Sequence, residues 1–190
     1  MVSNIAASQQ QEVELDKYLC FMLGDKRYAA NILRIKEIME HMEVTSIPMM
    51  PEFLCGVTNL RGKVVPVIDL GKRLGMDAVA IGRRTCIVIM EVTIHEASMD
   101  VGIMVDAVNQ VADISPGQIE AAPTFGGNIS TEFIEGMGKV GDEFVVLLDI
   151  DRLLSLDDLN LLSGASNMAP QIASQVTSNE QGNAEECNHG

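Results

Sequence analysis

The hydrophobic residues of this chain fall in short runs broken by Gly, Pro, Asn and Asp, a pattern typical of many short strands. One run, 32–39, has apolar residues at a spacing that suits a helical turn or a bent strand, and its β-branched content favours strand. Apolar residues separated by acids over 153–162 predict an amphipathic helix. The expected strands are 18–23, 27–31, 32–39, 44–47, 57–60, 64–68, 85–90, 100–105, 107–114 and 144–150.

The clearest single pattern is a hairpin over residues 55–70. Arg61 and Gly62 lie at a tight reversal between two strand-like runs, and Gly62 can adopt the positive φ that a short hairpin turn often requires. Pro66 has no N–H to donate, so we expect its strand at a sheet edge or beside a bulge. No catalytic chemistry is visible in this stretch, whereas a sheet edge can receive another protein.

An internal repeat covers much of the chain. Residues 51–74 lie without a gap over residues 131–154, an offset of 80 (131 − 51 = 80). Upstream, an offset of 73 aligns Ile32, Ile35 and Ile38 with Val105, Val108 and Val111. Two similar units of short strands predict a mostly β protein made of two small packed barrels, the first at about 16–80 and the second at about 81–152.

The hairpin tip is not shared between the two repeats. Arg61 aligns with Gly141, and Gly62 aligns with Asp142. The fold itself therefore does not demand an arginine at this tip.

Composition narrows the possible partners. The chain has 190 residues, of which 47% are hydrophobic but only 4% aromatic, so its core must be aliphatic and rich in its twelve methionines. A net charge of −14 disfavours nucleic acid and anionic membrane surfaces as direct partners. Residues 1–15 and 164–190 are polar, and we expect both to be disordered. No apolar run approaches the roughly 18 residues needed to span a bilayer, and no signal peptide is visible, so we expect a cytoplasmic protein.

The chain has few residues whose pattern suits catalysis. The cysteines are far apart and form no C-x-x-C, which favours free thiols, mostly buried, over disulfides or metal ligands. The histidines are isolated from any other base or ligand, which favours surface positions. We therefore expect no enzyme activity, no metal and no cofactor. The residues concerned are Cys20, Cys55, Cys86 and Cys187, and His41, His95 and His189.

Asp69 and Asp149 are carboxylates repeated at the same place. A paired acid and base is conceivable, but each ends a strand just before a helical turn, so helix N-capping explains both better. The glycines of 136–138 resemble a phosphate loop only faintly, and turn glycines are the better interpretation.

Several residues have two open interpretations. The methionines at 39, 42, 49 and 50 can fill the core or form an adaptable binding surface beside the proline turns. Glu37 and Arg61 are ordinary solvated charges in the simpler interpretation. The alternative is that they pair across adjacent strands and hold the hairpin tip in place.

The stretch Gly56-Val-Thr-Asn-Leu-Arg-Gly-Lys-Val-Val-Pro-Val-Ile-Asp-Leu70 closely resembles the signature of the CheW family, the coupling proteins of bacterial chemotaxis. The resemblance covers about residues 16–163. It also includes 18–25, 35–38, 101–106, 116–119, 130–133 and 149–154. It implies two packed five-stranded SH3-like β-barrels with short helices, followed by a C-terminal amphipathic helix at about 152–163.

The resemblance also implies a function. Such proteins are non-enzymatic adaptors that dock on the cytoplasmic tip of chemoreceptors and on the regulatory domain of the histidine kinase CheA, and they help to assemble receptor arrays. The second barrel can pair with another kinase or coupling protein in array rings. Carried over to this chain, the receptor-binding residues are Ile35, Gly56, Cys86, Gly102 and Val108, the kinase-binding residues are Ile32 and Ile38, and the coupling charge pair is Glu37 with Arg61. Cys86 stands where an aliphatic residue is commoner in the family.

Two other functions remain open from the sequence. A CheW-like module of a different chemosensory pathway would have the same sequence features. A small-ligand-binding β-barrel would need an enclosed pocket with convergent polar groups, which the sequence does not supply. The chain has no response-regulator domain after the CheW-like part, which argues against the related CheV adaptors.

Overall fold

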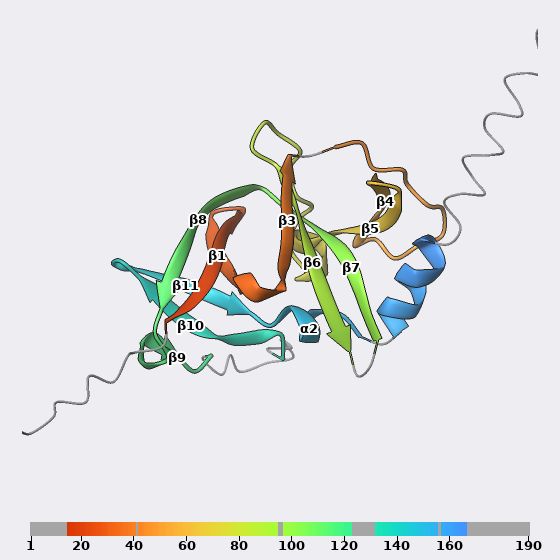
Figure 1. Ribbon diagram of the computed structural model, residues 1–190. Coiled ribbons are helices and arrows are strands. Elements are labelled where there is room, and N and C mark those ends of the chain that lie inside the picture. Colours follow the sequence, from red (N-terminus) through yellow and green to blue (C-terminus); the bar gives the residue numbers. More distant parts are fainter. Residues whose placement is uncertain (1–14, 41, 95–96, 123–131, 156, 167–190) are drawn as a thin grey trace, which may run out of the picture.

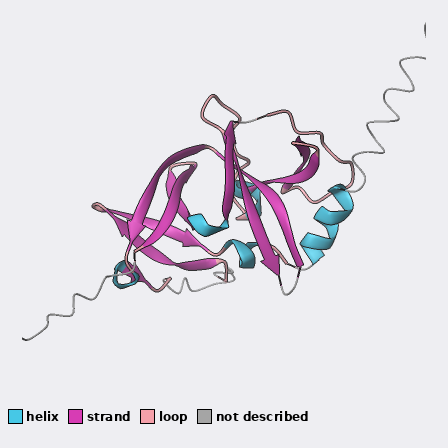
Figure 2. Ribbon diagram, viewed as in Figure 1, coloured by secondary structure: helices cyan, strands magenta, loops and turns pink. Residues whose placement is uncertain are grey.

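The protein folds into two β-sheets that pack together, with short helices between them (Figures 1 and 2). The computed structural model describes residues 15–40, 42–94, 97–122, 132–155 and 157–166. The strands are β1 (Asp16–Leu23), β2 (Lys26–Asn31), β3 (Ile35–Glu40), β4 (Leu54–Leu60), β5 (Lys63–Asp69), β6 (Cys86–Ile94), β7 (Ala97–Val105), β8 (Ala107–Ile114), β9 (Ile119–Glu120), β10 (Ile134–Val140) and β11 (Glu143–Leu148). The short helices are η1 (Ile32–Arg34), α1 (Leu70–Arg73), η2 (Pro116–Gln118) and α2 (Ile150–Leu153), and residues 157–166 form a further helix.

Sheet A has the strand order β8-β1-β2-β11-β10-β9, and sheet B has the order β3-β6-β7-β5-β4. The prediction of a mostly β protein with two packed units is therefore confirmed. The sheets have six and five strands, and neither closes on itself among the described residues, so closed five-stranded barrels are not seen. Each sheet contains one parallel pair, β2 with β11 in sheet A and β7 with β5 in sheet B.

The sequence repeat is visible in the strand register. Leu147 pairs with Ala29 in sheet A, and the equivalent residues Val67 and Gly102 pair in sheet B. The bulge between Leu54 and Gly56 in β4 likewise recurs between residues 134 and 136 in β10. The two sheets are therefore built on one plan, in which β8, β1, β2, β11 and β10 correspond to β3, β6, β7, β5 and β4.

The two repeats exchange their first hairpins. β1 and β2 precede β3 in the chain but join sheet A, whereas β6 and β7 precede β8 but join sheet B. Sheet B is thus built from residues 35–105, and sheet A from residues 16–31 and 107–148. The predicted division at residue 80 into consecutive barrels differs from this arrangement. The predicted division assumed that the strands of each repeat pair only with one another.

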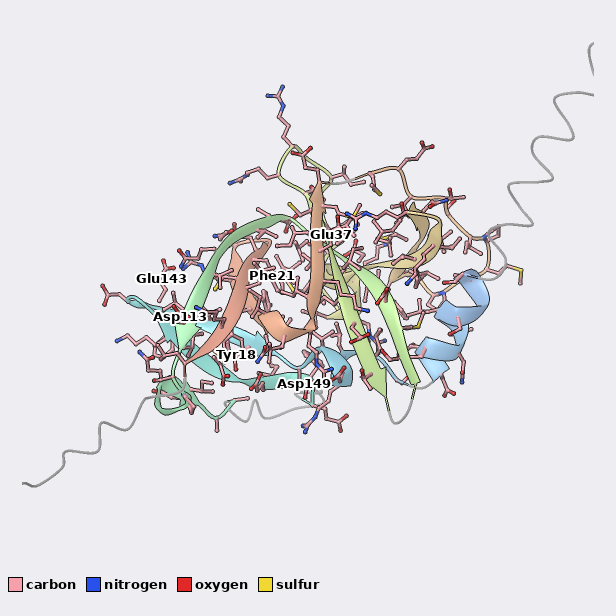
Figure 3. All side chains as sticks on the ribbon, viewed as in Figure 1. Tyr18, Phe21, Glu37, Asp113, Glu143 and Asp149 are labelled. Atoms are coloured by element: carbon pink, nitrogen blue, oxygen red, sulfur yellow. The ribbon has the colours of Figure 1, made fainter. Side chains whose placement is uncertain are left out.

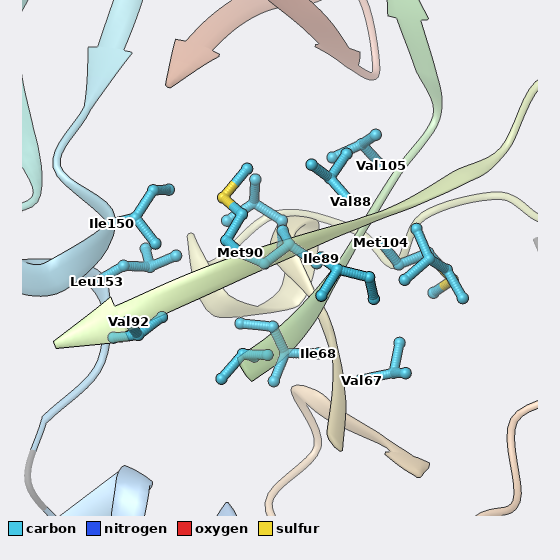
Figure 4. Close-up of a cluster of buried hydrophobic side chains, with 14 of the residues drawn as sticks. Val67, Ile68, Val88, Ile89, Met90, Val92, Met104, Val105, Ile150 and Leu153 are labelled. Atoms are coloured by element: carbon cyan, nitrogen blue, oxygen red, sulfur yellow. The ribbon is translucent and has the colours of Figure 1, made fainter. Parts of the chain in front are cut away.

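One aliphatic cluster joins the two sheets. It contains Leu19 and Phe21 of β1 together with strand residues of sheet B, and it extends to Ile150 and Leu153 of α2. Figure 4 shows these two α2 side chains beside Met90 and Val92 of β6. A second, smaller cluster lies within sheet A, and its members are Tyr18, Cys20, Ala29, Ala112, Ile114, Val145 and Leu147. Because α2 follows the last strand of sheet A but packs against β6, it ties the two sheets together.

The predicted C-terminal helix at about 152–163 has different bounds. α2 ends at Leu153, and Ser155 then caps the next helix: its backbone N–H donates to Asp158 Oδ2 (2.8 Å), and its Oγ accepts from the Asp158 N–H (3.1 Å). The described helix continues to residue 166, so residues 164–166 of the predicted disordered tail are helical. The rest of that tail, 167–190, and the N-terminal segment 1–14 lie outside the described residues.

Of two local predictions in the first repeat, one holds in part and the other is wrong. β5 lies inside sheet B between β7 and β4, so Pro66 is not on an edge strand, but it pairs with Val57 beside the bulge between Leu54 and Gly56. Pairing of β5 with β7 begins at Val67, one residue after the proline, so the missing N–H falls before the parallel ladder. The expected strand at 44–47 is only an isolated bridge between Thr45 and Val57.

Candidate protein-binding surface around the β4–β5 turn

The turn between β4 and β5 has an uncommon backbone. Arg61 has φ 51° and Gly62 has φ 85°, so both central residues lie in the left-handed region that two-residue hairpin turns with the twist of type I′ require. The side chain of Asn59 accepts a hydrogen bond from the Gly62 N–H at 2.8 Å and closes the turn. Asparagine or glycine is the usual occupant of the position that Arg61 takes.

The second repeat supplies an internal comparison. Gly141, the equivalent of Arg61, has φ 63°, nearly the same backbone conformation. A left-handed conformation costs a non-glycine residue about 1–2 kcal/mol. Arg61 therefore occupies a position where glycine is the relaxed choice.

Arg61 forms an ion pair with Glu37. Its Nη2 lies 2.7 Å from Glu37 Oε1, joining the turn to β3, and the Arg61 side chain is 79% exposed while that of Glu37 is 30% exposed. The pairing that the sequence left open is thus present, although the two strands are not hydrogen-bonded neighbours. An exposed pair of this kind is worth at most about 1 kcal/mol, so it orients the tip more than it stabilises the fold.

β3 presents a free edge. Among the described residues it pairs with β6 alone, and its exposed residues include Lys36, Ile38 and Glu40. Ile38 is 45% exposed, while Ile32 is half-buried in η1 at the entrance of the strand. An unpaired edge with an exposed aliphatic side chain can be covered by a partner.

Three of the expected receptor-binding residues have similar surroundings. Ile35, Cys86 and Val108 are half-buried and pack against the cluster that joins the two sheets. They come from β3 and the start of β6 in sheet B and from β8 in sheet A, so both sheets contribute to this group. Partly exposed apolar groups of this kind can gain further burial when a partner binds.

Gly56 and Gly102 have different surroundings, because both are buried. A Cβ on Gly56 would lie 2.0 Å from the carbonyl oxygen of Thr45, and Gly56 has φ 143°. A Cβ on Gly102 would lie 2.9 Å from Ile87 Cγ2. These glycines set the shape of sheet B and do not offer a surface of their own.

The methionines divide between the two interpretations that the sequence left open. Met39, Met42 and Met50 pack against the cluster that joins the sheets, and the Thr58 hydroxyl lies 3.0 Å from Met42 Sδ. Met49 is fully exposed and has φ 62°. Three of the four methionines therefore fill space, and one is available at the surface.

The candidate catalytic groups have structural explanations. Asp69 accepts a hydrogen bond from the Lys72 N–H, and Asp149 accepts from the Asp151 and Arg152 N–H groups, as the N-cap prediction requires. Cys20, Cys55 and Cys86 are free thiols; burial raises the pKa of Cys20, and burial, reinforced by the Asp69 carboxylate, raises the pKa of Cys55 to about 11. Such thiols are poor nucleophiles at neutral pH. Cys187 and all three histidines lie outside the described residues.

The grooves do not resemble a small-molecule site. Two grooves among the described residues measure about 580 and 610 Å³ and are open to solvent. The first is lined mostly by charged and hydroxyl side chains, and the second combines charged side chains with Phe133, Leu153 and Leu154. No group of three or more His, Cys, Asp or Glu in the described part of the chain could hold a metal ion. None of the described helices is long and apolar enough to cross a membrane.

Sequence reasoning did not find the links between distant segments. Arg34 of η1 pairs with Asp151 of α2, and Asp151 Oδ1 also accepts the Thr93 N–H of β6 at 2.8 Å. Arg73 donates to the Leu153 carbonyl oxygen and to Asp158, each at 2.8 Å. These partners are separated by 58 to 117 residues, and no local pattern marks them.

The fold and this surface define a protein-binding module: two sheets from a repeated plan, a free strand edge, and a charged turn that the shared frame does not require. Comparison with known proteins is consistent with that class. The model of the CheW-like domain matches residues 17–158, about three quarters of the chain, so the chain belongs to the CheW family, the coupling adaptors of chemotaxis.

Individual relatives support this assignment. The chemotaxis protein CheW of Klebsiella aerogenes is 35% identical over 150 residues, covering 79% of this chain and 88% of that protein. The Bacillus subtilis chemotaxis protein CheW is 34% identical over 163 residues, covering 85% of this chain and 95% of that one. The crystal structure of the scaffolding protein TtCheW from Thermoanaerobacter tengcongensis superimposes with a TM-score of 0.68 at 32% identity, covering 76% of this chain and 96% of that chain.

Proposed function

We propose that this protein is a non-enzymatic cytoplasmic adaptor that couples chemoreceptor tips to the histidine kinase CheA and takes part in receptor arrays. The observation that carries the proposal is Arg61. It occupies a left-handed turn position that glycine fills in the second repeat, and it pairs with Glu37 on the free β3 edge. A fold that needs no arginine there keeps one at an energetic cost, as expected of a residue retained for a partner.

The partners would bind two neighbouring surfaces. Receptor contacts would be made by Ile35, Cys86 and Val108, whose half-buried side chains lie at the junction of the sheets. Gly56 and Gly102 would act indirectly, by keeping sheet B in the shape that the receptor contacts.

Kinase contacts would be made by Ile32 and Ile38, along η1 and the β3 edge. Glu37 lies between these residues in the chain and pairs with Arg61. A change in the position of the turn would therefore alter the β3 surface that the kinase contacts. Coupling then requires only that the two receptor states contact the adaptor differently, since a ligand shifts an equilibrium by its differential affinity for the two states.

The proposal is tested by co-sedimentation with receptor-bearing membranes, with and without a CheA kinase from the same cell. We expect the protein to sediment with the receptors and to carry the kinase with it. Failure to form a ternary complex with any such kinase would refute the proposal.

The charge pair is tested by exchanging its signs. Arg61→Glu should weaken receptor control of the kinase, and the double variant Arg61→Glu with Glu37→Arg should recover part of it, because the pair is restored in reverse. If the single reversal left receptor binding, kinase binding and kinase control unchanged, the turn would have no part in coupling.

A different pathway is the second candidate. The protein FrzA of Myxococcus xanthus is 32% identical over 157 residues, close to the identities of the chemotaxis CheW proteins. Deleting the gene and scoring both swimming chemotaxis and surface movement separates the two, since an adaptor of the proposed pathway affects swimming chemotaxis.

A further inference from the structure

The repeat provides an internal standard for judging each face of the two sheets. In sheet B, the helix at 157–166 buries Leu159, Leu162 and Ala165 in the cluster that joins the sheets. Ser163 and Ser166 of this helix line one groove together with Val64 and Met99, and Ser163 Oγ lies 3.9 Å from Met99 Sδ. One face of sheet B is thus bordered and partly covered by the chain's own amphipathic helix, which lies beside β5 and β7 in Figure 1.

The equivalent face of sheet A is lined by strand and turn residues only. The offsets of 80 and 73 place Phe144 at the position of Val64, Met137 at that of Val57, and Lys26 at that of Met99. These side chains line a groove of about 480 Å³ whose remaining residues are Met22, Asp25, Arg27, Glu143 and Val146, and no described helix contributes to it.

Three apolar side chains in this groove lack a place in the core. Met22, Met137 and Phe144 belong to neither hydrophobic cluster among the described residues, and Phe144 is 55% exposed. In sheet B the residue equivalent to Met137 is Val57, which is 3% exposed. The same position is therefore buried in one sheet and only half-buried in the other.

The groove has charges of both signs, since Lys26 and Arg27 lie beside Asp25 and Glu143. Arg27 Nη1 lies 2.7 Å from Glu143, yet its Nε, buried from solvent, has no hydrogen-bond partner in the described part of the chain. A buried donor without an acceptor is unfavourable by about 1–3 kcal/mol. Lys26 adds a second cation where sheet B has Met99. Because Arg27 is already paired with Glu143 and its Nε is shielded from solvent, exposed Lys26 is the cation that a carboxylate on an incoming segment can reach.

We propose that this face of sheet A binds an amphipathic α-helix of a partner protein, with leucine-like residues spaced three apart and a carboxylate directed at Lys26. The chain's own helix shows the type of occupant, because Leu159, Leu162 and Ala165 have this spacing and Asp157 and Asp158 precede them. Helix-in-groove binding of this kind uses apolar anchors on one face of the helix.

This surface is separate from the proposed coupling turn. Glu143 lies at one end of the molecule, well away from Glu37 on β3 (Figure 3). An adaptor with both surfaces could hold a helical segment of a third partner without displacing partners from the β3 edge.

A peptide with the sequence of residues 153–166 serves as the probe. It is titrated into the full chain with its methionine methyl groups labelled for NMR. We expect saturable shifts of Met22 and Met137, while exposed Met49 stays unchanged. Phe144→Ser should weaken binding about tenfold, the effect of losing one apolar anchor at roughly 1.4 kcal/mol. Because Phe144 is exposed, the variant should remain folded, which the unchanged Met99 signal verifies.

The controls decide between the proposal and its rivals. A peptide of the same composition, reordered so that its leucines are no longer spaced three or four apart, should produce no shift. Absence of shifts with the original peptide, or equal binding by Phe144→Ser, would overturn the proposal. So would shifts confined to Met99, which would mean that the peptide replaces the chain's own helix. Shifts of Met22 that follow protein concentration without peptide would assign the face to a second copy instead.

Discussion

Replacing Arg61 by glycine is expected to preserve stability while removing receptor control of the kinase. Arg61 has φ 51°, which costs an L-residue about 1–2 kcal/mol, and glycine relieves this but loses about 0.5–1 kcal/mol of extra entropy on folding. Loss of the ion pair with Glu37 adds a cost of about 0.2–1 kcal/mol, because the Arg61 side chain is 79% exposed. These terms nearly cancel, so the free energy of unfolding should change by less than about 1 kcal/mol.

Two further variants separate the strain from the charge. Arg61→Ala keeps the left-handed conformation and loses the pair, so urea unfolding should show it about 1 kcal/mol less stable than Arg61→Gly. Gly141→Arg, the matched change in the second repeat, should lower stability by about 1 kcal/mol and leave kinase control intact. Control is measured as CheA autophosphorylation on receptor membranes. The reasoning is refuted if Arg61→Ala is as stable as Arg61→Gly, or if Arg61→Gly retains full control.

Three further outcomes concern the scaffold. Gly102→Ala should lower the urea-unfolding free energy by about 1–3 kcal/mol, because its Cβ would lie 2.9 Å from an isoleucine side chain; an unchanged midpoint would contradict this. Burial, with Glu135 nearby, raises the pKa of Tyr18 to about 12. In a Tyr28→Phe variant Tyr18 is the remaining tyrosine, and ultraviolet absorbance should show its phenol ionising near pH 12. Stability should then fall as pH rises from about 10 to 12, since the unfolded phenol loses its proton first, and a transition near pH 10 in the folded protein would refute it. Asp69→Ala should cost about 2–3 kcal/mol and Asp149→Ala about 1 kcal/mol, because Asp69 is buried and also accepts a buried N–H; thermal unfolding showing equal losses would count against the argument.

Local chemistry made much of the fold predictable. Alternation and β-branched runs located most of the strands, and the matched Asp69 and Asp149 caps followed from their position between strand and turn. The hairpin exchange was not predictable from one sequence, because a repeat looks the same whether its hairpin pairs with its own half or with the other. The edge position expected for Pro66 was wrong for a related reason: an inner strand tolerates proline where pairing with its neighbour, here β7, begins only at the next residue.

The candidate surface was only partly accessible from the sequence. The repeat marked Arg61 as a departure from the shared frame, and the opposite charge of Glu37 made it a possible partner. The left-handed conformation of Arg61 could be suspected from Gly141 alone, since aligned turns share their backbone. The groove beside Phe144 could not, because it depends on which face the helix at 157–166 covers.

The exchanged hairpins also set the order in which the chain can acquire structure. Sheet B is complete once residue 105 has been synthesised, whereas sheet A needs β8 to pair with β1 and then β11 to pair with β2, more than a hundred residues after the hairpin. Until β8 has been made, β1 and β2 form only a two-stranded hairpin, and until β11 has been made β2 keeps a free edge, a state prone to association with other chains. Cutting the chain between the repeats would give two fragments, each holding strands that the other sheet needs. Neither would form a complete sheet alone, but mixed together they could rebuild the whole protein from separate pieces.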